Sequence, residues 1–491
     1  MQKKFLTNLS LLLFLNLLVK PFWVLGIDRG VQNAVGAESY GFYFAILNFS
    51  FLFNILLDFG ITNFNNRNIA QNHQLLNKHF SSIVILKFLL AAVYFLVTFS
   101  IGLLLKYNSQ QLLILVFLGF NQFLLSFILY LRSNISGLLM FKTDSIISVL
   151  DRILMILFCG ILLWGNITKI PFRIEWFVYS QTTAYLITIA IAAGIVATRA
   201  SFKKLHWNMA FFVMIIKRSF PFAILVLLMT FYNRIDSVMI ERLLRGTTGN
   251  EQTGIYASAY RLLDATNMIA YLFAVLLLPL FARMIKNKEP VEKLVKLSFT
   301  MLVTVATVVA IVAIFYGHDI MSLLYPIHEN ESAPMFAHRI EQSSQIFGIL
   351  MCGFIAISTT YVFGTLLTAN GNLKYLNLIA AGGMFLNILL NLILIPRMFA
   401  TGAAITSLIT QGITAFLQVM LTQYIFRFKI NYVYLLRLVV FILGAVLIGW
   451  ILSKTGLWWV KSLLLTGVLI LLLSAVLKLM NIKSFINILR G

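Results

Sequence analysis

Long runs of apolar residues, separated by short polar breaks, fill almost the whole chain. A helix needs about 20 such residues to cross a bilayer, and these runs reach that length without the alternating polarity of a barrel strand. We therefore predict an all-α polytopic membrane protein with about fourteen transmembrane helices. Their expected bounds are 5–25, 40–60, 82–105, 111–131, 143–164, 176–198, 219–244, 254–281, 297–316, 343–368, 373–395, 400–425, 435–453 and 457–479.

Composition and charge agree with a membrane protein. Of the 491 residues, 60% are hydrophobic and only 11% are charged, yet the net charge is +22. No basic arm, zinc-finger spacing or RNA-binding motif accompanies this charge, so nucleic acid is not an expected partner. Most Lys and Arg residues instead fall in alternate connections, most densely in 199–218 and 283–296. The positive-inside rule then places these loops and both termini in the cytoplasm.

A repeated motif indicates an internal duplication. Residues 36–43 and 249–256 both read G-x-E-x-x-G-x-Y, and both begin a transmembrane run after a predicted outer turn. We expect two pseudo-symmetric six-helix bundles, 1–205 and 206–430, followed by an extra helix pair in 431–491. Because both copies cross the membrane in the same direction, their symmetry axis should lie along the membrane normal.

Four ionisable residues lie deep within two neighbouring spans. Arg234 and Asp236 belong to span 219–244, and Arg261 and Asp264 belong to span 254–281. A central Arg or Asp costs about 2.5–3.5 kcal/mol on insertion, so these side chains should face protein or water. Antiparallel packing would place Asp236 near Arg261 and Arg234 near Asp264. Two interpretations stay open: a structural ion pair, or a polar wall with an Arg available to an anion.

Other charges within the spans are weaker candidates. Asp151 and Arg152 are adjacent in sequence and diverge by about 100° on a helix, so we expect pairing with another helix, in a structural or gating role. Lys20 precedes Pro21, which indicates a kink, with snorkelling as the alternative. We expect Lys87 to snorkel to the inner surface and Asp58 to lie at the interface.

Amides in span 373–395 suggest hydrogen bonds between helices. Asn387 and Asn391 share one face at i,i+4, and Asn377 lies in the same span. Such amides usually bond across helices, and a cation site with Asp236 and Thr406 is the less favoured interpretation. Phosphate-loop, Ser–His–Asp and zinc signatures are absent from the sequence, so we expect neither an enzyme nor a cofactor.

These motifs together resemble a known family. The two Gly-Glu-Gly-Tyr hairpins, Leu57-Asp58-Phe59-Gly60, Arg234-Ile235-Asp236, and the sequence from Asn387 through Pro396 to Ala404 are similar to the polysaccharide branch of the multidrug/oligosaccharidyl-lipid/polysaccharide exporter superfamily. The resemblance implies two bundles around a central cavity and alternating access. It also implies that an undecaprenyl-pyrophosphate-linked glycan, such as an O-antigen repeat unit, crosses a bacterial plasma membrane. A polysaccharide polymerase or glycosyltransferases would then be partners.

The resemblance also assigns roles to residues. Lys20, Arg152, Arg234 and Arg261 would offset the pyrophosphate charge, and Asp151, Asp236 and Asp264 would form gating ion pairs. A sodium site would use Asp236, Asn387, Asn391 and Thr406. Drug exporters of the superfamily usually stop at twelve helices, so the extra pair favours a lipid-linked substrate. The alternatives are a cation-coupled multidrug exporter and a glycan polymerase, although the 317–342 loop is small and acidic for a polymerase.

Overall fold

The computed structural model describes residues 15–479, except 17, 63–64, 67–68, 70–73, 166–169, 200–206, 208, 329–330 and 430. Residues 5–14 of the first predicted span, Lys203 and Lys204 of an expected cytoplasmic loop, and both chain termini lie outside the described residues.

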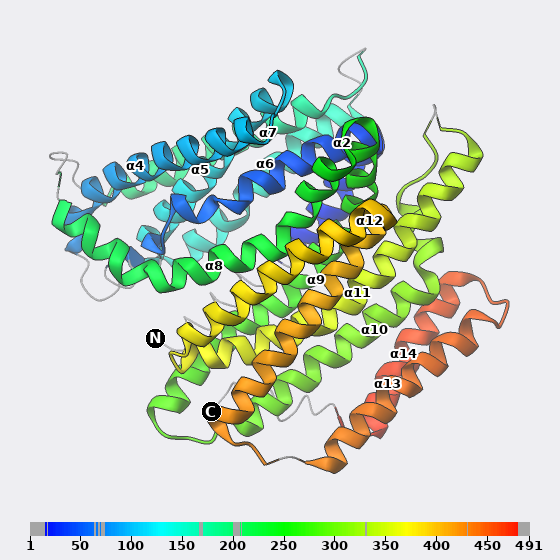
Figure 1. The fold of residues 1–491 in the computed structure, drawn as a ribbon. Coiled ribbons are helices and arrows are strands. Elements are labelled where there is room, and N and C mark those ends of the chain that lie inside the picture. The colour runs from blue at the N-terminus through cyan, green and yellow to red at the C-terminus, as the bar shows by residue number, and fades with distance from the viewer. Residues whose placement is uncertain are drawn as a thin grey trace. The chain divides into compact units, whose positions relative to one another are not determined.

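All regular structure in the described part is helical, as predicted (Figure 1). In chain order the helices are η1 (Trp23–Asp28), α2 (Arg29–Leu52), η2 (Asn54–Leu57), α4 (Leu75–Leu104), α5 (Ser109–Gly137), α6 (Phe141–Trp164), α7 (Ile174–Ala197), α8 (Met209–Leu244), α9 (Gly246–Lys286), α10 (Glu292–Leu324), α11 (Ala333–Ala369), α12 (Leu373–Phe426), α13 (Tyr432–Ser453) and α14 (Trp459–Val476).

Eleven helices in the described part of the chain are long and apolar enough to cross a membrane. The longest, α12, contains two predicted spans, which meet where the backbone is non-helical at Phe399. In the same way, α2 joins the ends of the first two spans across a kink at Gly36. The predicted polytopic helical fold is therefore confirmed, and each predicted span has a helix within the described residues.

The end of the first span differs from the prediction. We expected it at residue 25, but helical structure continues through η1 and into α2, up to the left-handed Gly36 at φ +80°. Within this stretch Asp28 is only 2% exposed and accepts a hydrogen bond of 2.8 Å from the Tyr40 hydroxyl. Asp28, one of the polar residues that suggested a loop, is instead buried against a partner across the kink. A hydropathy pattern does not detect such pairing, because it treats each residue separately.

The chain forms two compact units. The first comprises residues 1–241 and 246–254, and the second comprises 242–245 and 255–491. In the first unit α5 packs against α2, α4, α6 and α7. Buried aliphatic and aromatic side chains fill the space among α4, α5 and α7, including Ile83, Leu131 and Val196. The predicted bundle boundary at residues 205 and 206 stays a prediction.

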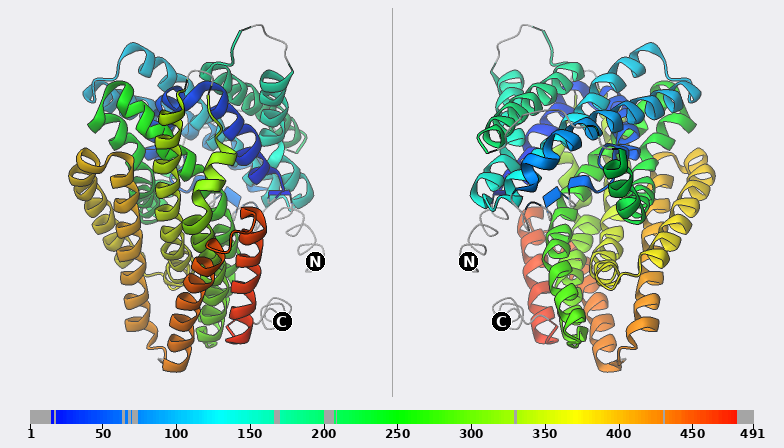
Figure 2. Two further views of the ribbon diagram at one scale, coloured as in Figure 1. Left: turned by 90° about the vertical axis from the view of Figure 1, so that its right-hand side faces the viewer. Right: turned by 90° about the vertical axis from the view of Figure 1, so that its left-hand side faces the viewer.

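In the second unit α11 packs between α10 and α12, and the α13–α14 hairpin packs along α10 (Figure 2). The Tyr316 hydroxyl of α10 bonds to Ser462 at 2.7 Å and to Thr466 at 2.8 Å, both on α14. Gly449 of α13 lies so close to α10 that an added Cβ would be 2.6 Å from the Ile311 side chain. The extra helix pair is therefore closely packed and hydrogen-bonded within this unit.

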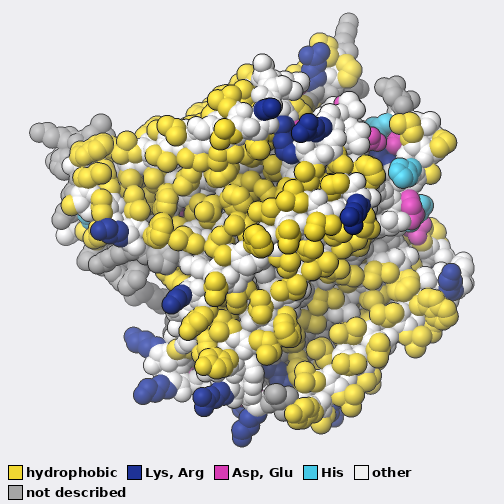
Figure 3. All heavy atoms as spheres, in the orientation of Figure 1, with side chains coloured by type: hydrophobic (Ala, Val, Ile, Leu, Met, Phe, Trp, Pro, Cys, Tyr) yellow, Lys and Arg dark blue, Asp and Glu magenta, His cyan; other side chains and the backbone are white. Residues whose placement is uncertain are grey.

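The surface is that of a protein surrounded by lipid. Large apolar side chains cover much of the face shown in Figure 3. Leu378 and Phe385 on α12 are 71% and 68% exposed, and Leu96 on α4 is 69% exposed. Continuous apolar surface of this extent would promote aggregation in water, whereas in a bilayer it contacts acyl chains.

An ion pair closes the connection between α10 and α11. Arg339 donates from Nε and Nη2 to the two carboxylate oxygens of Glu331, at 2.7 and 2.8 Å, and from Nη2 to the Pro326 carbonyl oxygen at 3.1 Å. The His328 backbone N–H also donates to this carboxylate. Burial alone would raise the pKa of Glu331, but the hydrogen bonds and charge of Arg339 outweigh it and lower that pKa. Burial and the charge of Arg339 lower the pKa of His328.

These shifts predict an acid-sensitive loop. Because the folded state binds protons less readily than the unfolded chain at both residues, their stabilising contributions are present at neutral pH. The His328 contribution should be lost as pH falls from about 6.5 through the lowered pKa, and the Glu331 contribution should follow below about 4.5. Hydrogen exchange of residues 325–332 against pH measures both losses. His328→Gln should remove only the first, whereas the exposed His318→Gln should leave the profile unchanged. If hydrogen exchange in His328→Gln depended on pH as it does in the wild-type protein, the assignment of the first loss to His328 would be wrong.

Candidate functional site

Five charged residues gather within the first unit. Arg132 near the end of α5 forms a two-point ion pair with Asp144 of α6, with N···O distances of 2.8 and 3.3 Å. Arg152 lies one residue after Asp151, and its Nε is 3.6 Å from the Asp151 carboxylate. We had expected one of these two residues to pair with another helix. Arg152 does contact the Trp23 ring of η1, and it also lies beside its neighbour Asp151, a contact that the sequence analysis did not anticipate.

Lys20 belongs to this group of charges. It is half-buried, and its ammonium interacts electrostatically with Arg152, Asp151 and Arg132. The distortion expected at Pro21 takes the form of the π-helix η1, which begins two residues later. The structure thus brings together the predicted residues Lys20, Asp151 and Arg152. We name the group the first-unit charge cluster, with members Lys20, Arg132, Asp144, Asp151 and Arg152.

The sequence analysis did not identify Arg132 and Asp144. Both lie near the expected ends of spans, where a charge needs no partner. The sequence could have indicated this pair through the position of the two residues on either side of a short turn, since residues that flank a helical hairpin often meet. With them the first-unit charge cluster has three basic and two acidic members, a net positive charge.

Aromatic rings hold the Arg152 side chain. Its guanidinium carbon lies 5.5 Å from the centre of the Trp23 ring, and its Nη1 lies 3.6 Å from the sulfur of Met155. Trp23 in turn stacks on Phe177 of α7, with ring centres 5.7 Å apart. A planar cation over an aromatic face is attracted to the ring and restricted in orientation. The Arg152 guanidinium is therefore held in a restricted orientation by the protein itself.

Arg234 and Asp236 on α8 also lie in the first unit. Arg234 is half-buried, with Nη1 3.4 Å from the Asn48 side-chain oxygen and its guanidinium 5.5 Å from the centre of the Phe51 ring. Asp236 is 1% exposed. The predicted pairs between these residues and Arg261 and Asp264 stay predictions.

The candidates in the second unit lie on α9 and α12. Arg261 and Asp264 share a helical face, as expected, with 3.6 Å between guanidinium and carboxylate. The Asn391 amide donates to the Asn387 side-chain oxygen at 3.1 Å, and both residues are fully buried. Thr406 is also buried, and its hydroxyl has no hydrogen-bond partner among the described residues.

This arrangement fits a cation only in part. Asn387 and Thr406 offer oxygen ligands, which sodium prefers, and the Asn387 oxygen also accepts a hydrogen bond from the Asn391 amide. In the described part of the chain, no three His, Cys, Asp or Glu residues are placed to hold a metal ion. The sodium site with Asp236, Asn387, Asn391 and Thr406 therefore stays a prediction.

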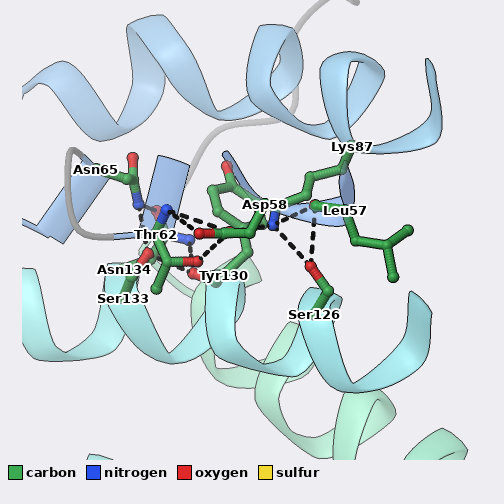
Figure 4. A network of polar contacts seen from close by, with 9 residues as sticks. All are labelled: Leu57, Asp58, Thr62, Asn65, Lys87, Ser126, Tyr130, Ser133 and Asn134. Carbon is green, nitrogen blue, oxygen red and sulfur yellow. Dashed lines mark hydrogen bonds and ion pairs between the residues drawn. The ribbon is translucent and has the colours of Figure 1, made fainter. Parts of the chain in front are cut away.

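A second polar network, which the sequence analysis misjudged, surrounds Lys87 of α4 (Figure 4). Lys87 is 1% exposed, and its ammonium donates to the Leu57 carbonyl oxygen at 3.0 Å, to Ser126 at 2.9 Å and to the Asp58 carboxylate. Asp58 also accepts from the Thr62 hydroxyl. Snorkelling of Lys87 was thus a wrong prediction, because its three donors are satisfied inside the protein.

Comparisons with known proteins give the family. The model of the polysaccharide biosynthesis protein family matches residues 29–285, more than half of the chain. The chain belongs to this family. No curated protein sequence matches it.

Solved structures of transporters share its fold. A lipid II flippase, MurJ, in an inward-closed conformation aligns with a TM-score of 0.69 and 15% identity, over 95% of this chain and 98% of MurJ. A multidrug resistance MATE transporter in an inward-facing conformation aligns with a TM-score of 0.62 and 12% identity, over 84% of this chain and 98% of the transporter. A Vibrio cholerae MATE transporter, VcmN, aligns with a TM-score of 0.52 and 16% identity, over 86% and 98%. This member of the polysaccharide biosynthesis family therefore shares the fold of these transporters.

The Lys87 network predicts a large loss of stability on truncation. Lys87→Met would leave Asp58 and the Leu57 carbonyl oxygen without the ammonium, and removing one partner of a buried ion pair costs about 3–5 kcal/mol. Because Asp58 is partly exposed, we expect about 3 kcal/mol, measured as the free energy of unfolding in detergent. Adding Asp58→Asn should recover part of the loss. Lys106→Met, at an exposed turn, should have little effect. Equal stability of the two lysine variants would contradict this account.

Proposed function

We propose that this protein is a flippase that carries an undecaprenyl-pyrophosphate-linked polysaccharide repeat unit across the bacterial plasma membrane by alternating access. The sugar and pyrophosphate would occupy the polar interior, while the polyprenyl chain would stay in lipid. Membership of the polysaccharide biosynthesis family and the transporter fold support a carrier in glycan assembly. The identity of the glycan, such as an O-antigen unit, belongs to the proposal.

The observation that carries the proposal is the first-unit charge cluster. Arg132 is matched by Asp144, while Lys20 and Arg152 share Asp151 as a neighbouring carboxylate. This excess of positive charge within transmembrane helices is costly unless an anion is bound at some stage. A pyrophosphate supplies that charge, and a guanidinium binds phosphate oxygens through paired N–H donors. The two carboxylates would keep the affinity low enough for release.

Arg261 and Arg234 are candidates for a second contact with the substrate during transport. Arg261 lies 3.6 Å from the Asp264 carboxylate and its side chain remains 17% exposed, so the guanidinium is accessible to a phosphate. Asp151, Asp236 and Asp264 would take up the released guanidinium groups in the other state. A cation at Asp236, Asn387, Asn391 and Thr406 is a proposed source of energy for the cycle.

The extra helix pair distinguishes this proposal from a cation-coupled multidrug exporter. The lipid II flippase aligns with 95% of this chain, whereas the MATE transporters align with 84–86%. The hydrogen bonds from Tyr316 to α14 make α13 and α14 an integral part of the second unit. An accessory pair beside the bundle suits a substrate with a long lipid chain better than a small drug. Deleting residues 431–491 should therefore abolish glycan export. Drug resistance in a sensitive host that survives this deletion would instead favour the drug exporter.

The role of Arg152 can be tested by substitution. Arg152→Ala should lower export about 10–100-fold at limiting substrate, the equivalent of losing about 1.5–3 kcal/mol from hydrogen bonds to a charged group. Arg152→Lys should be intermediate, because it keeps the charge without the paired donors. Export is measured by complementing a glycan-export null strain and following labelled lipid-linked intermediate on each leaflet.

The matched control is Arg173→Ala, at an exposed position before α7 in the same unit. It should export normally at the same protein level. If Arg152→Ala and Arg173→Ala export equally well, Arg152 is not a substrate contact. Failure of the wild-type protein to complement any glycan-export null would refute the proposed function itself.

A further inference from the structure

The second predicted span is broken near its inner end, and the break frees a backbone carbonyl group. The short turn η2 follows α2, and after it Phe59 and Gly60 adopt left-handed backbone conformations with φ +44° and +78°. In a continuous α-helix the Ile61 N–H would donate to the Leu57 carbonyl oxygen, but here it donates to that of Asp58, at 2.8 Å. The Leu57 carbonyl oxygen is therefore available to side chains.

Three oxygen atoms converge on the Lys87 ammonium at this break (Figure 4). Leu57 supplies its carbonyl oxygen at 3.0 Å, Ser126 of α5 its hydroxyl oxygen at 2.9 Å, and Asp58 a carboxylate oxygen. The Ser126 hydroxyl donates its own proton to the Leu57 carbonyl oxygen at 3.0 Å, so it faces the ammonium as an acceptor. All three ligands are oxygen atoms, and together they carry a single negative charge. We name these three oxygens the break site.

The break site has the chemistry of a cation site in a carrier. Where a transmembrane helix is interrupted, its unwound carbonyl groups can coordinate a coupling ion, and metal ions such as sodium prefer oxygen ligands. In this protein the positive charge belongs to the end of the Lys87 side chain, which is attached to α4. A tethered ammonium cannot leave the site as a free ion does. It can instead lose a proton, which removes the same positive charge.

The two charged groups differ in their access to water. Lys87 is 1% exposed, whereas the Asp58 side chain is 26% exposed. A proton that leaves the ammonium breaks an N–H bond, forms an O–H bond on the Asp58 carboxylate, and then passes to water. Thr62 donates both its hydroxyl and its backbone N–H to this carboxylate, which fixes its orientation. Asp58 thus connects the buried amine with the solvent.

The charge of Lys87 matters for the packing of the broken segment. Asp58 is the charged group that acts on it, and the other titratable side chain of the network, Tyr130 of α5, donates to the Phe80 carbonyl oxygen at 3.2 Å. The rest of the network is neutral and internally hydrogen-bonded, and comprises Asn65, Ser133 and Asn134. Loss of the proton from Lys87 therefore removes the ion pair that joins α4 to the break.

We propose that the break site is a monovalent-cation site filled by the protein's own lysine, and that Lys87 exchanges a proton through Asp58 during each transport cycle. The proton would then take the place of a free coupling ion. The coupling step rests on the proposed function, because it assumes transport. The cation site itself does not, and it is tested separately.

Removing the lysine should open the break site to a free cation. Lys87→Ala leaves the three oxygens and removes the atoms of a propylammonium ion, that is, three carbons and the ammonium group. We expect about 100 mM propylammonium chloride to raise the thermal unfolding midpoint of this purified variant in detergent by at least about 3 °C, because a ligand that binds the folded state stabilises it.

The controls separate a cation site from a cavity. Propanol has the same shape without the charge, and choline is larger and has no N–H donor, so neither should raise the midpoint. Propylammonium should not stabilise Lys106→Ala, at an exposed turn. If Lys106→Ala responds to propylammonium as Lys87→Ala does, or if propanol stabilises Lys87→Ala equally well, the break site is not a cation site.

Lys87→Gln tests the proton step, and it decides the inference if the alanine variant does not accumulate. The glutamine amide can donate to the Leu57 and Ser126 oxygens but carries no exchangeable charge. In membrane vesicles the wild-type protein should export lipid-linked intermediate at least about threefold faster with an imposed pH gradient than without one, because proton exchange is coupled to transport. Lys87→Gln and Asp58→Asn should lose this acceleration.

Arg173→Ala, at an exposed position in the same unit, should keep the wild-type acceleration. Acceleration of Lys87→Gln equal to that of the wild-type protein would overturn the proton step, and so would wild-type export that ignores the gradient. If the wild-type protein exports no glycan at all, the proposed function fails. The response of Lys87→Ala to propylammonium still decides the cation site in that case.

Discussion

The structure depends on satisfying charged and polar groups without water. In the hydrocarbon region of a bilayer an unpaired ion or backbone group has no solvent to compensate it, so each must find a partner inside the protein. Lys87 uses all three ammonium donors on Leu57, Asp58 and Ser126. The first-unit charge cluster follows the same rule but with an excess of positive charge. That imbalance is the reason why we propose that the cluster binds an anion and does not only join helices.

The same constraint shapes the backbone. Helices satisfy their own N–H and C=O groups, so they can approach one another closely wherever side chains are small. Gly449 lets α13 lie against α10, and Gly41 and Gly254 let α2 lie against α9. The first contact is reinforced by side-chain hydrogen bonds from Tyr316 and serves stability. In the second contact backbone faces backbone, and the Gln32 side chain donates a hydrogen bond to the Gly254 carbonyl oxygen beside it.

Family and fold together narrow the function without specifying the substrate. The family match concerns polysaccharide biosynthesis, while the fold is shared by a lipid II flippase and by drug transporters. Our proposal of a lipid-linked anion as substrate rests on the α13–α14 pair and the first-unit charge cluster. In this proposal the α13–α14 pair would lie near the lipid chain, and the first-unit charge cluster would bind the pyrophosphate.

The sequence by itself determined the helical class, nearly all of the spans, the duplicated motif and the pairs Arg261–Asp264 and Asn387–Asn391. These follow from hydrophobic length and helical periodicity, which act between residues close in the chain. Only the tertiary structure decided that Lys87 is buried against Asp58, that Arg132 and Asp144 complete a charge cluster, and that the two motif copies meet. Those partners lie on different elements of the chain, and their contact depends on how the helices pack, which periodicity along one helix does not encode.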